Sequence, residues 1–144
     1  MPVYRALLEH PAAHDPIFHK LRSPHEYMVA TLRALDLNSD LATGKGWLKA
    51  PQALTAMAQS GYRTPGPDGW PDSAEAWATG PALAARLNWG EALARRFGEK
   101  ADPAAMARAV LGGGEEATIL AAGRAEQRWE GVAVLLGAPA FMRR

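Results

Sequence analysis

The sequence predicts an all-α protein, a compact orthogonal bundle of five to seven helices that carries one long loop rich in proline and tryptophan. Three observations predict this class. Apolar residues recur at helical spacing along the chain, and no stretch alternates as a strand would. The 144 residues, 48% hydrophobic and 22% charged, suit one globular domain. The glycines and prolines gather between the periodic segments, as they do at turns. We therefore expect residues 1–144 to form a single helical domain.

The first two helices have clear boundaries in the sequence. A short helix is expected over Val3–Glu9, because the next residue precedes a proline and such residues avoid helical torsions. The second helix is expected from Pro24 to about Leu35. Ser23 can cap it, proline suits its first position, and Glu26 completes a capping box. Its inner face comprises Tyr27, Met28, Thr31, Leu32 and Leu35.

The middle of the chain alternates between loop and helix. Residues 36–50 are expected to form a loop, and a helix over Pro51–Ser60 should end at Gly61 in the left-handed conformation. The segment Tyr62–Asp72 holds three prolines and two glycines, which no regular element tolerates. Ser73 then provides a helix start. The side chains expected to face inward from the helix before Gly61 are Leu54, Met57 and Ala58.

The longest helix is expected over Pro81–Phe97, with Thr79 or Gly80 as its cap and Gly98 as its end. At 100° per residue its apolar stripe contains Leu83, Leu87, Gly90, Ala94 and Phe97. Three further helices are expected over Pro103–Leu111, Glu115–Ala122 and Ala125–Leu136.

Charge and composition exclude several classes of function. Sixteen basic and fifteen acidic side chains, spread evenly, produce no field that would attract nucleic acid. The longest uncharged stretches are shorter than the roughly 18 apolar residues that suggest a membrane span. With no cysteine, the chain has no disulfide, thiolate zinc site or cysteine nucleophile. We expect no nucleic-acid partner and no membrane insertion.

The four histidines, His10, His14, His19 and His25, lie within sixteen residues. Imidazole binds zinc, copper and nickel, so a metal site is one interpretation of this cluster. Intervening prolines prevent a chelate between residues four apart on one helix, and no His-Glu-x-x-His motif occurs. Histidines at the surface or at helix ends are the favoured interpretation, and we expect no metal or other cofactor.

Motifs for catalysis are missing from the sequence. No serine stands in a Gly-x-Ser-x-Gly elbow, and the glycine run 112–114 lacks the lysine that follows in a phosphate loop. We therefore predict no catalytic residue, and no activity for this chain by itself.

The loop and the residues after it hold three aromatic side chains, Tyr62, Trp70 and Trp77. Tryptophans in a proline-rich loop either pack onto the core or present themselves to a ligand. The favoured interpretation is an omega loop anchored by its tryptophans. A small-ligand pocket at residues 62–77, with the ligand itself unidentified, is the alternative.

Arg86 also bears on whether the loop packs onto the core or forms a ligand pocket. It projects about 60° from the centre of the apolar stripe, so its guanidinium should be half-buried and requires acceptors. Loop carbonyls, Asp68 or Asp72 are the expected partners, and Arg86 would then attach the loop to the long helix. Alternatively, Arg86 binds an anion. The candidate ligand-binding residues are Tyr62, Asp68, Trp70, Trp77 and Arg86.

Several of these segments together resemble one bacterial family, catalogued only as domain of unknown function number eighteen hundred. The matching residues are the run Ser23-Pro24-x-Glu26-Tyr27, the loop Pro65-Gly-Pro-x-Gly69-Trp70-Pro71, Trp77, and Leu83-x-x-Arg86-Leu87-Asn88. The chain's ending, residues 136–144, is similar to the family's ser-pro-glu-phe-gln-arg-arg ending, with alanine and methionine replacing three of its residues. The resemblance covers nearly the whole chain in the right order.

Our first hypothesis is a helical structural or interaction module, and the resemblance adds a family but no mechanism. Family members are commonly longer, so this chain is similar to their C-terminal part, and the expected partner is the remainder of its own protein. The family has no established activity. Its members often stand beside genes for an exported sulfatase-like family, which implies an exported or periplasmic location, whereas the chain alone indicates a cytoplasmic one. A docking surface is expected around Tyr4, Phe18 or Phe141.

Overall fold

The computed structural model describes residues 2–14, 20–37, 50–61, 63–71, 73–112 and 114–144. Within these ranges the secondary structure is helical, and the pairing of extended backbone is limited to two isolated bridges, Leu21 with Arg143 and Gly66 with Gly69. The predicted all-α class is confirmed. The predicted loop over 36–50 lies largely outside the described residues.

The described ranges contain nine α-helices, namely α1 (Pro2–Glu9), α2 (Pro24–Ala34), α4 (Ala50–Ala56), α5 (Ala74–Trp77), α6 (Gly80–Phe97), α7 (Pro103–Leu111), α8 (Glu116–Gly123), α9 (Arg128–Gly137) and α10 (Pro139–Met142). Short 3-10 segments follow α1 and α6, at Pro11–His14 and Gly98–Lys100. Seven α-helices match predicted ones, α5 follows the start signal at Ser73, and α10 is an addition.

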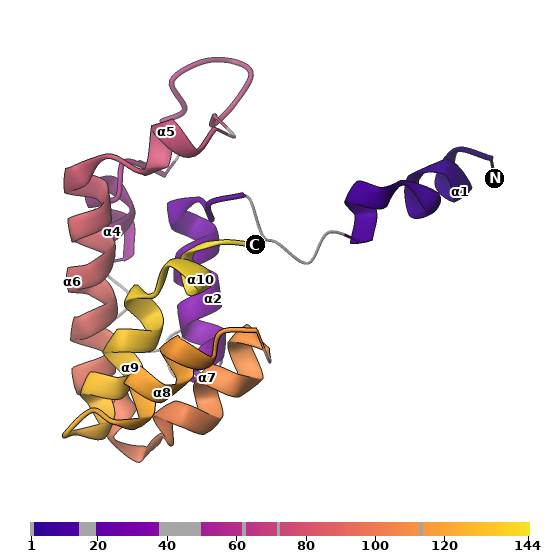
Figure 1. Ribbon diagram of the computed structural model, residues 1–144. Helices are drawn as coiled ribbons and strands as arrows, with labels where there is room; N and C mark the ends of the chain where they lie inside the picture. The colour runs from indigo at the N-terminus through magenta and orange to yellow at the C-terminus, as the bar shows by residue number, and fades with distance from the viewer. Residues whose placement is uncertain (1, 15–19, 38–49, 62, 72, 113) are drawn as a thin grey trace.

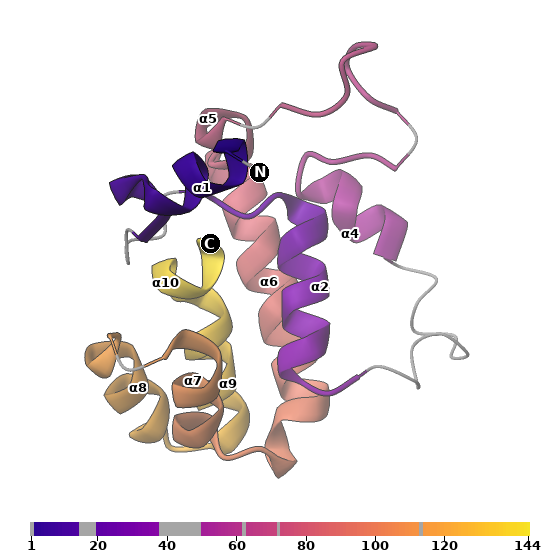
Figure 2. The same ribbon diagram turned by 90° about the vertical axis from the view of Figure 1, so that its right-hand side faces the viewer.

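The bundle is built around α6 and α9, which pack against each other along much of their length. The helices α7 and α8 lie side by side against α9 at one end, and α4 packs on α6 (Figure 1). A quarter turn shows α2 alongside α6, with the C-terminus near the beginning of α2 (Figure 2). In Figure 1, α1 stands apart from the bundle.

The core is centred on Tyr27 of α2. Its ring meets Phe141 edge-on, with ring centroids 5.9 Å apart, and lies 6.1 Å from the ring of Trp89. A Cβ atom at Gly90 would lie 2.6 Å from the Tyr27 hydroxyl oxygen, so the absence of a side chain lets α2 and α6 approach. The other fully buried apolar side chains of this cluster include Met57, Val132, Leu135 and Leu136.

Side chains cap the helices where the sequence predicts. The Ser23 hydroxyl accepts from the Glu26 N–H at 3.3 Å, and the Glu26 carboxylate accepts from the Ser23 N–H at 2.8 Å. Asp102 caps α7 by accepting from two backbone N–H groups. The start of α9 is three residues later than predicted, because Gln127 and Glu130 form a second capping box there.

The end predicted for the helix over Pro51–Ser60 is wrong. The helix α4 ends at Ala56, and Ala58, not Gly61, adopts a positive φ of 72°. The N–H of Gln59 bonds to the Leu54 carbonyl and that of Ala58 to the Thr55 carbonyl, which is the Schellman arrangement. Ala58 is consequently exposed and not directed inward. The Gln59 side chain meanwhile accepts from the His25 N–H at 2.8 Å, which ties this turn to α2.

The apolar stripe predicted for the long helix needs one correction. The buried row of α6 runs through Ala82, Arg86, Gly90 and Ala94 at four-residue spacing, so Arg86 lies on the core face. Leu87 is 47% exposed. It lines a groove of about 410 Å³ between α6 and α9 instead of the core.

Candidate functional site

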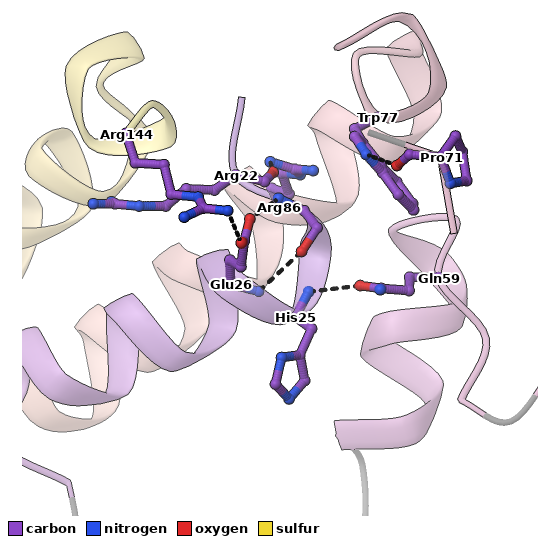
Figure 3. Close-up of polar contacts among 9 residues, drawn as sticks. Arg22, His25, Glu26, Gln59, Pro71, Trp77, Arg86 and Arg144 are labelled. Atoms are coloured by element: carbon purple, nitrogen blue, oxygen red, sulfur yellow. Dashed lines mark hydrogen bonds and ion pairs between the residues drawn. The ribbon is translucent and has the colours of Figure 1, made fainter. Parts of the chain in front are cut away.

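The structure joins two of the five predicted ligand-binding residues. The rings of Trp70 and Trp77 lie 5.9 Å apart, and the indole N–H of Trp77 donates to the Pro71 carbonyl at 3.0 Å (Figure 3). Trp77 is buried and Trp70 half-buried. These contacts fit the anchored loop, with α5 as the element that holds it. Asp68 is exposed in the turn between the bridged glycines, and Tyr62 lies outside the described residues.

The predicted attachment of the loop by Arg86 is wrong. The Nη1 atom of Arg86 donates to the Arg22 carbonyl at 2.8 Å, on the segment that leads into α2. Asp72 lies outside the described residues, and Asp68 is exposed. Arg86 points this way because it belongs to the buried row of α6 that faces α2, where the guanidinium lies 5.6 Å from the centre of the Tyr27 ring.

Arg86 is fully buried, with no exposed surface, although half-burial is predicted. Its Nε and Nη2 atoms are buried and have no hydrogen-bond acceptor in the part of the chain that the structure describes. Burial lowers the pKa of this guanidinium, and the Tyr27 hydroxyl opposes that change. Arginine keeps its charge even so. Among the described residues, the buried Arg86 guanidinium therefore has the Arg22 carbonyl as its one hydrogen-bond acceptor.

Arg22 links Arg86 to a third arginine, because its carbonyl accepts from Arg86 and its charge senses that of Arg144. We call Arg22, Arg86 and Arg144 the arginine junction (Figure 3). The Arg22 guanidinium stacks on the Phe141 ring, 5.1 Å from its centre, and donates to the Phe141 carbonyl. Burial lowers the pKa of Arg22, and Arg144 lowers it further while Glu26 raises it. Within the junction, the positive charge of Arg144 thus opposes that of Arg22.

Glu26 is the carboxylate that contacts this junction. One oxygen pairs with the Arg144 guanidinium at 2.5 Å, and the other accepts from the Ser23 N–H. Partial burial opposes its ionisation, but the Ser23 N–H and Arg144 together hold the pKa of Glu26 below its ordinary value. Both oxygens therefore already have partners.

The end of the chain builds one side of the junction. Lys20 and Arg144 exchange backbone hydrogen bonds of 3.3 and 2.9 Å, and the Arg22 N–H donates to the Met142 carbonyl at 2.8 Å. These contacts join segments more than 110 residues apart, so helical periodicity gives no indication of them. The one signal in the sequence is the pair of arginines in the family-like ending, which charge analysis alone assigns to the surface.

The histidines do not come together in the described ranges. His14 contacts the Leu8 carbonyl through Nε2 at 2.6 Å, and His10 accepts from the Ala12 N–H through Nδ1. His25 is an exposed side chain at the start of α2, and His19 lies outside the described residues. No group of three or more metal-ligating side chains occurs within those ranges.

Two of the three residues predicted to mark a docking surface can be placed. Phe141 is fully buried, so that part of the prediction is wrong: its ring fills the space between Tyr27 and Arg22. Tyr4 is 69% exposed, and Phe18 lies outside the described residues. Tyr4 belongs to an apolar face on α1, where Val3, Leu7 and Leu8 are also exposed by 60% or more.

No helix among the described residues is long and apolar enough to cross a membrane. This agrees with the lengths of the uncharged stretches in the sequence.

Comparison with known proteins gives one match. The model of a family described as protein of unknown function (DUF1800) matches residues 1–143. Neither the curated proteins nor the solved structures contain a match. The family match spans the capping box, the tryptophan-anchored loop and Arg86, all of which are among the residues that carry the resemblance. The chain therefore belongs to the DUF1800 family of proteins of unknown function.

Proposed function

We propose that this chain is a helical interaction module, the C-terminal part of a longer protein, and that it docks the remainder of that protein through α1. The observation that carries the proposal is the state of α1. The helix is amphipathic, stands apart from the bundle and has no buried residue.

The residues of α1 divide cleanly between two faces. At 100° per residue, Val3, Tyr4, Leu7 and Leu8 fall within an arc of about 140°. Arg5 and Glu9 lie on the opposite side. Such a pattern is typical of a helix that packs one face onto a groove or another helix.

The burial of α1 supports the same conclusion. No residue of this helix is buried, so it gains no stability from packing on the bundle. Packing of its apolar face on a partner would stabilise it. Full burial of each large apolar side chain contributes about 1.5–3 kcal/mol, partly offset by the ordering of the helix.

The proposal is tested by titrating this chain with the separately produced remainder of its protein in a calorimeter. We expect Leu7→Glu and Leu8→Glu to weaken the binding strongly, because each places a charge in the apolar face. Ala6→Glu adds the same charge to the polar face of the same helix and should bind like the unaltered chain. Equal affinity for all three variants, or no binding by the unaltered chain, would refute the proposal.

A small-ligand pocket at residues 62–77 has less support. Trp70 and Trp77 pack against each other, Asp68 is exposed, and Arg86 donates to Arg22. The tryptophans therefore serve the loop's own structure in this proposal.

A further inference from the structure

The two Arg86 donors that lack an acceptor are not an arbitrary pair. The Nε–H and one Nη2–H of a guanidinium point the same way in one plane and form the edge that grips both oxygens of a carboxylate or phosphate. Arg95 donates from these same two atoms to one oxygen, Oε1, of the Glu91 carboxylate, at 3.0 and 2.7 Å. On Arg86 the Nε/Nη2 edge is fully buried and without an acceptor among the described residues.

A buried charged edge of this kind is costly. Leaving a buried donor unpaired forfeits its hydration, and the loss is larger when the group is charged. Nearly all buried polar groups in folded proteins have a partner, counting bound water and ions. Arg86 is thus expected to meet an acceptor that is not one of the described residues.

The charges around Arg86 indicate that the missing acceptor is negatively charged. Arg86 is itself a fully buried positive charge, and Glu26, the carboxylate that contacts the junction, has both oxygens engaged by Arg144 and the Ser23 N–H. A water molecule could satisfy donors but would leave this positive charge uncompensated. An anion with two coplanar oxygens would accept from both donors and also compensate the positive charge.

We propose that the Nε/Nη2 edge of Arg86, within the arginine junction, is a binding site for one oxyanion of the carboxylate or phosphate type. The segment 20–22 borders the guanidinium, since the Arg22 carbonyl is the acceptor of Nη1. That segment is held to residues 142–144 by three backbone hydrogen bonds. Local opening of this short pairing admits the anion, as local opening elsewhere admits solvent to buried groups.

The test observes the side-chain Nε–H signals of arginine by NMR in the full 144-residue chain. Sodium phosphate, sodium sulfate and sodium acetate are each titrated at an ionic strength held constant with sodium chloride. We expect the Arg86 signal, assigned by its contact with the Tyr27 ring, to shift and saturate with at least one of them. A response to phosphate and sulfate alone identifies a phosphate-type ligand, and a response to acetate identifies a carboxylate.

The anion affinities of two arginine variants provide a second test. Arg86→Lys keeps the positive charge but lacks the edge, and should bind the anion at least about tenfold more weakly, the effect of losing one charge-assisted hydrogen bond. Arg95→Lys removes the same edge at an exposed position and should leave the affinity unchanged. If Arg86→Lys does not fold, the titration of the Arg86 Nε–H signal in the unaltered chain still tests the proposal. An Arg86 signal that none of the three anions shifts beyond the effect of chloride overturns the proposal.

Discussion

The hydroxyl oxygen of Tyr27 lies 3.3 Å from the carbonyl oxygen of Leu136 and donates a hydrogen bond there across 109 residues of sequence. The same hydroxyl lies 3.2 Å from the carbonyl oxygen of Arg86. One side chain of α2 therefore contacts the backbones of both α6 and α9. Because Tyr27 is fully buried, these contacts position the three helices that surround the arginine junction.

Removing that hydroxyl should destabilise the bundle. We expect Tyr27→Phe to lower the free energy of unfolding by about 0.5–1.5 kcal/mol, the usual net worth of one buried hydrogen bond. Urea denaturation followed by circular dichroism measures this difference. The matched control is Tyr4→Phe, which removes a hydroxyl from an exposed side chain and should have no effect. Equal stability of the two variants would show that the Tyr27 hydroxyl does not link the helices.

The ionisation of Tyr27 should make stability depend on pH in the alkaline range. Burial raises the pKa of Tyr27 from 10.0 to about 12, while the neighbouring Thr31 side chain and the charge of Arg86 oppose part of that rise. The neutral phenol is thus favoured in the folded state, and its contribution is fully present below the unfolded pKa. We expect that contribution to be lost as the pH rises from about 10 to about 12, by at most about 1.4 kcal/mol per pH unit.

Comparison with Tyr27→Phe isolates this effect, since lysines also titrate in that range. The difference in unfolding free energy between the unaltered chain and the variant should shrink as the pH is raised. A difference that stays constant across the range would mean that Tyr27 ionises as easily in the folded as in the unfolded chain.

The capping box at the start of α2 provides a test of the helix boundary. Ser23→Ala should lower the free energy of unfolding by about 1 kcal/mol through loss of the bond to the Glu26 N–H. Ser73→Ala serves as its control, because Ser73 stands at the N-cap of α5 but its side chain makes no capping bond. Chemical denaturation of both variants compares them directly. The interpretation fails if Ser73→Ala proves as damaging as Ser23→Ala.

The anchoring of the loop by tryptophan predicts a difference between the two indoles. Trp77→Ala should cost about 3–5 kcal/mol, as large aromatic truncations in cores do. It also removes the bond to the Pro71 carbonyl, so trypsin should cut faster after Arg63. Trp70→Ala should cost less, since Trp70 is half-buried. Unchanged digestion after Arg63 in Trp77→Ala would remove the support for an anchored loop.

The close approach of α2 and α6 predicts a steric effect at Gly90. An added Cβ would lie 2.6 Å from the Tyr27 hydroxyl oxygen and 3.5 Å from Cβ of Leu136. Gly90→Ala should therefore lower the melting temperature despite the better helix propensity of alanine. At Gly80, also in α6, an added Cβ meets nothing within 4 Å, so Gly80→Ala should not destabilise. A Gly90→Ala variant as stable as Gly80→Ala would contradict this packing.

Local chemistry made much of the fold predictable from sequence. Ser23 with Glu26 and Asp102 with its following proline determine helix starts through neighbouring atoms alone, and the structure confirms both. The end of α4 could not be predicted in the same way. Alanine at position 58 adopts a left-handed conformation that local preference assigns to Gly61, because the chain there turns to bring Gln59 to α2.

The candidate site was less predictable because it depends on contacts between distant segments. Arg86 was identifiable as a buried cation that needs acceptors, but the choice between Arg22 and the loop depends on which side of α6 faces α2. That side is determined by the row containing Gly90, whose lack of a side chain admits Tyr27. The pairing of Lys20 with Arg144 likewise has no signature in periodicity.

Hydrogen exchange of the backbone amides of α1 tests the proposed interaction module most directly. In this chain alone, we expect the amides of residues 3–9 to exchange almost as fast as in an unfolded peptide, since no tertiary packing protects them. Addition of the remainder of the protein should slow their exchange, while the amides of α6 and α9 remain protected throughout. Strong protection of α1 in the chain alone, or no change when the remainder is added, would contradict the account.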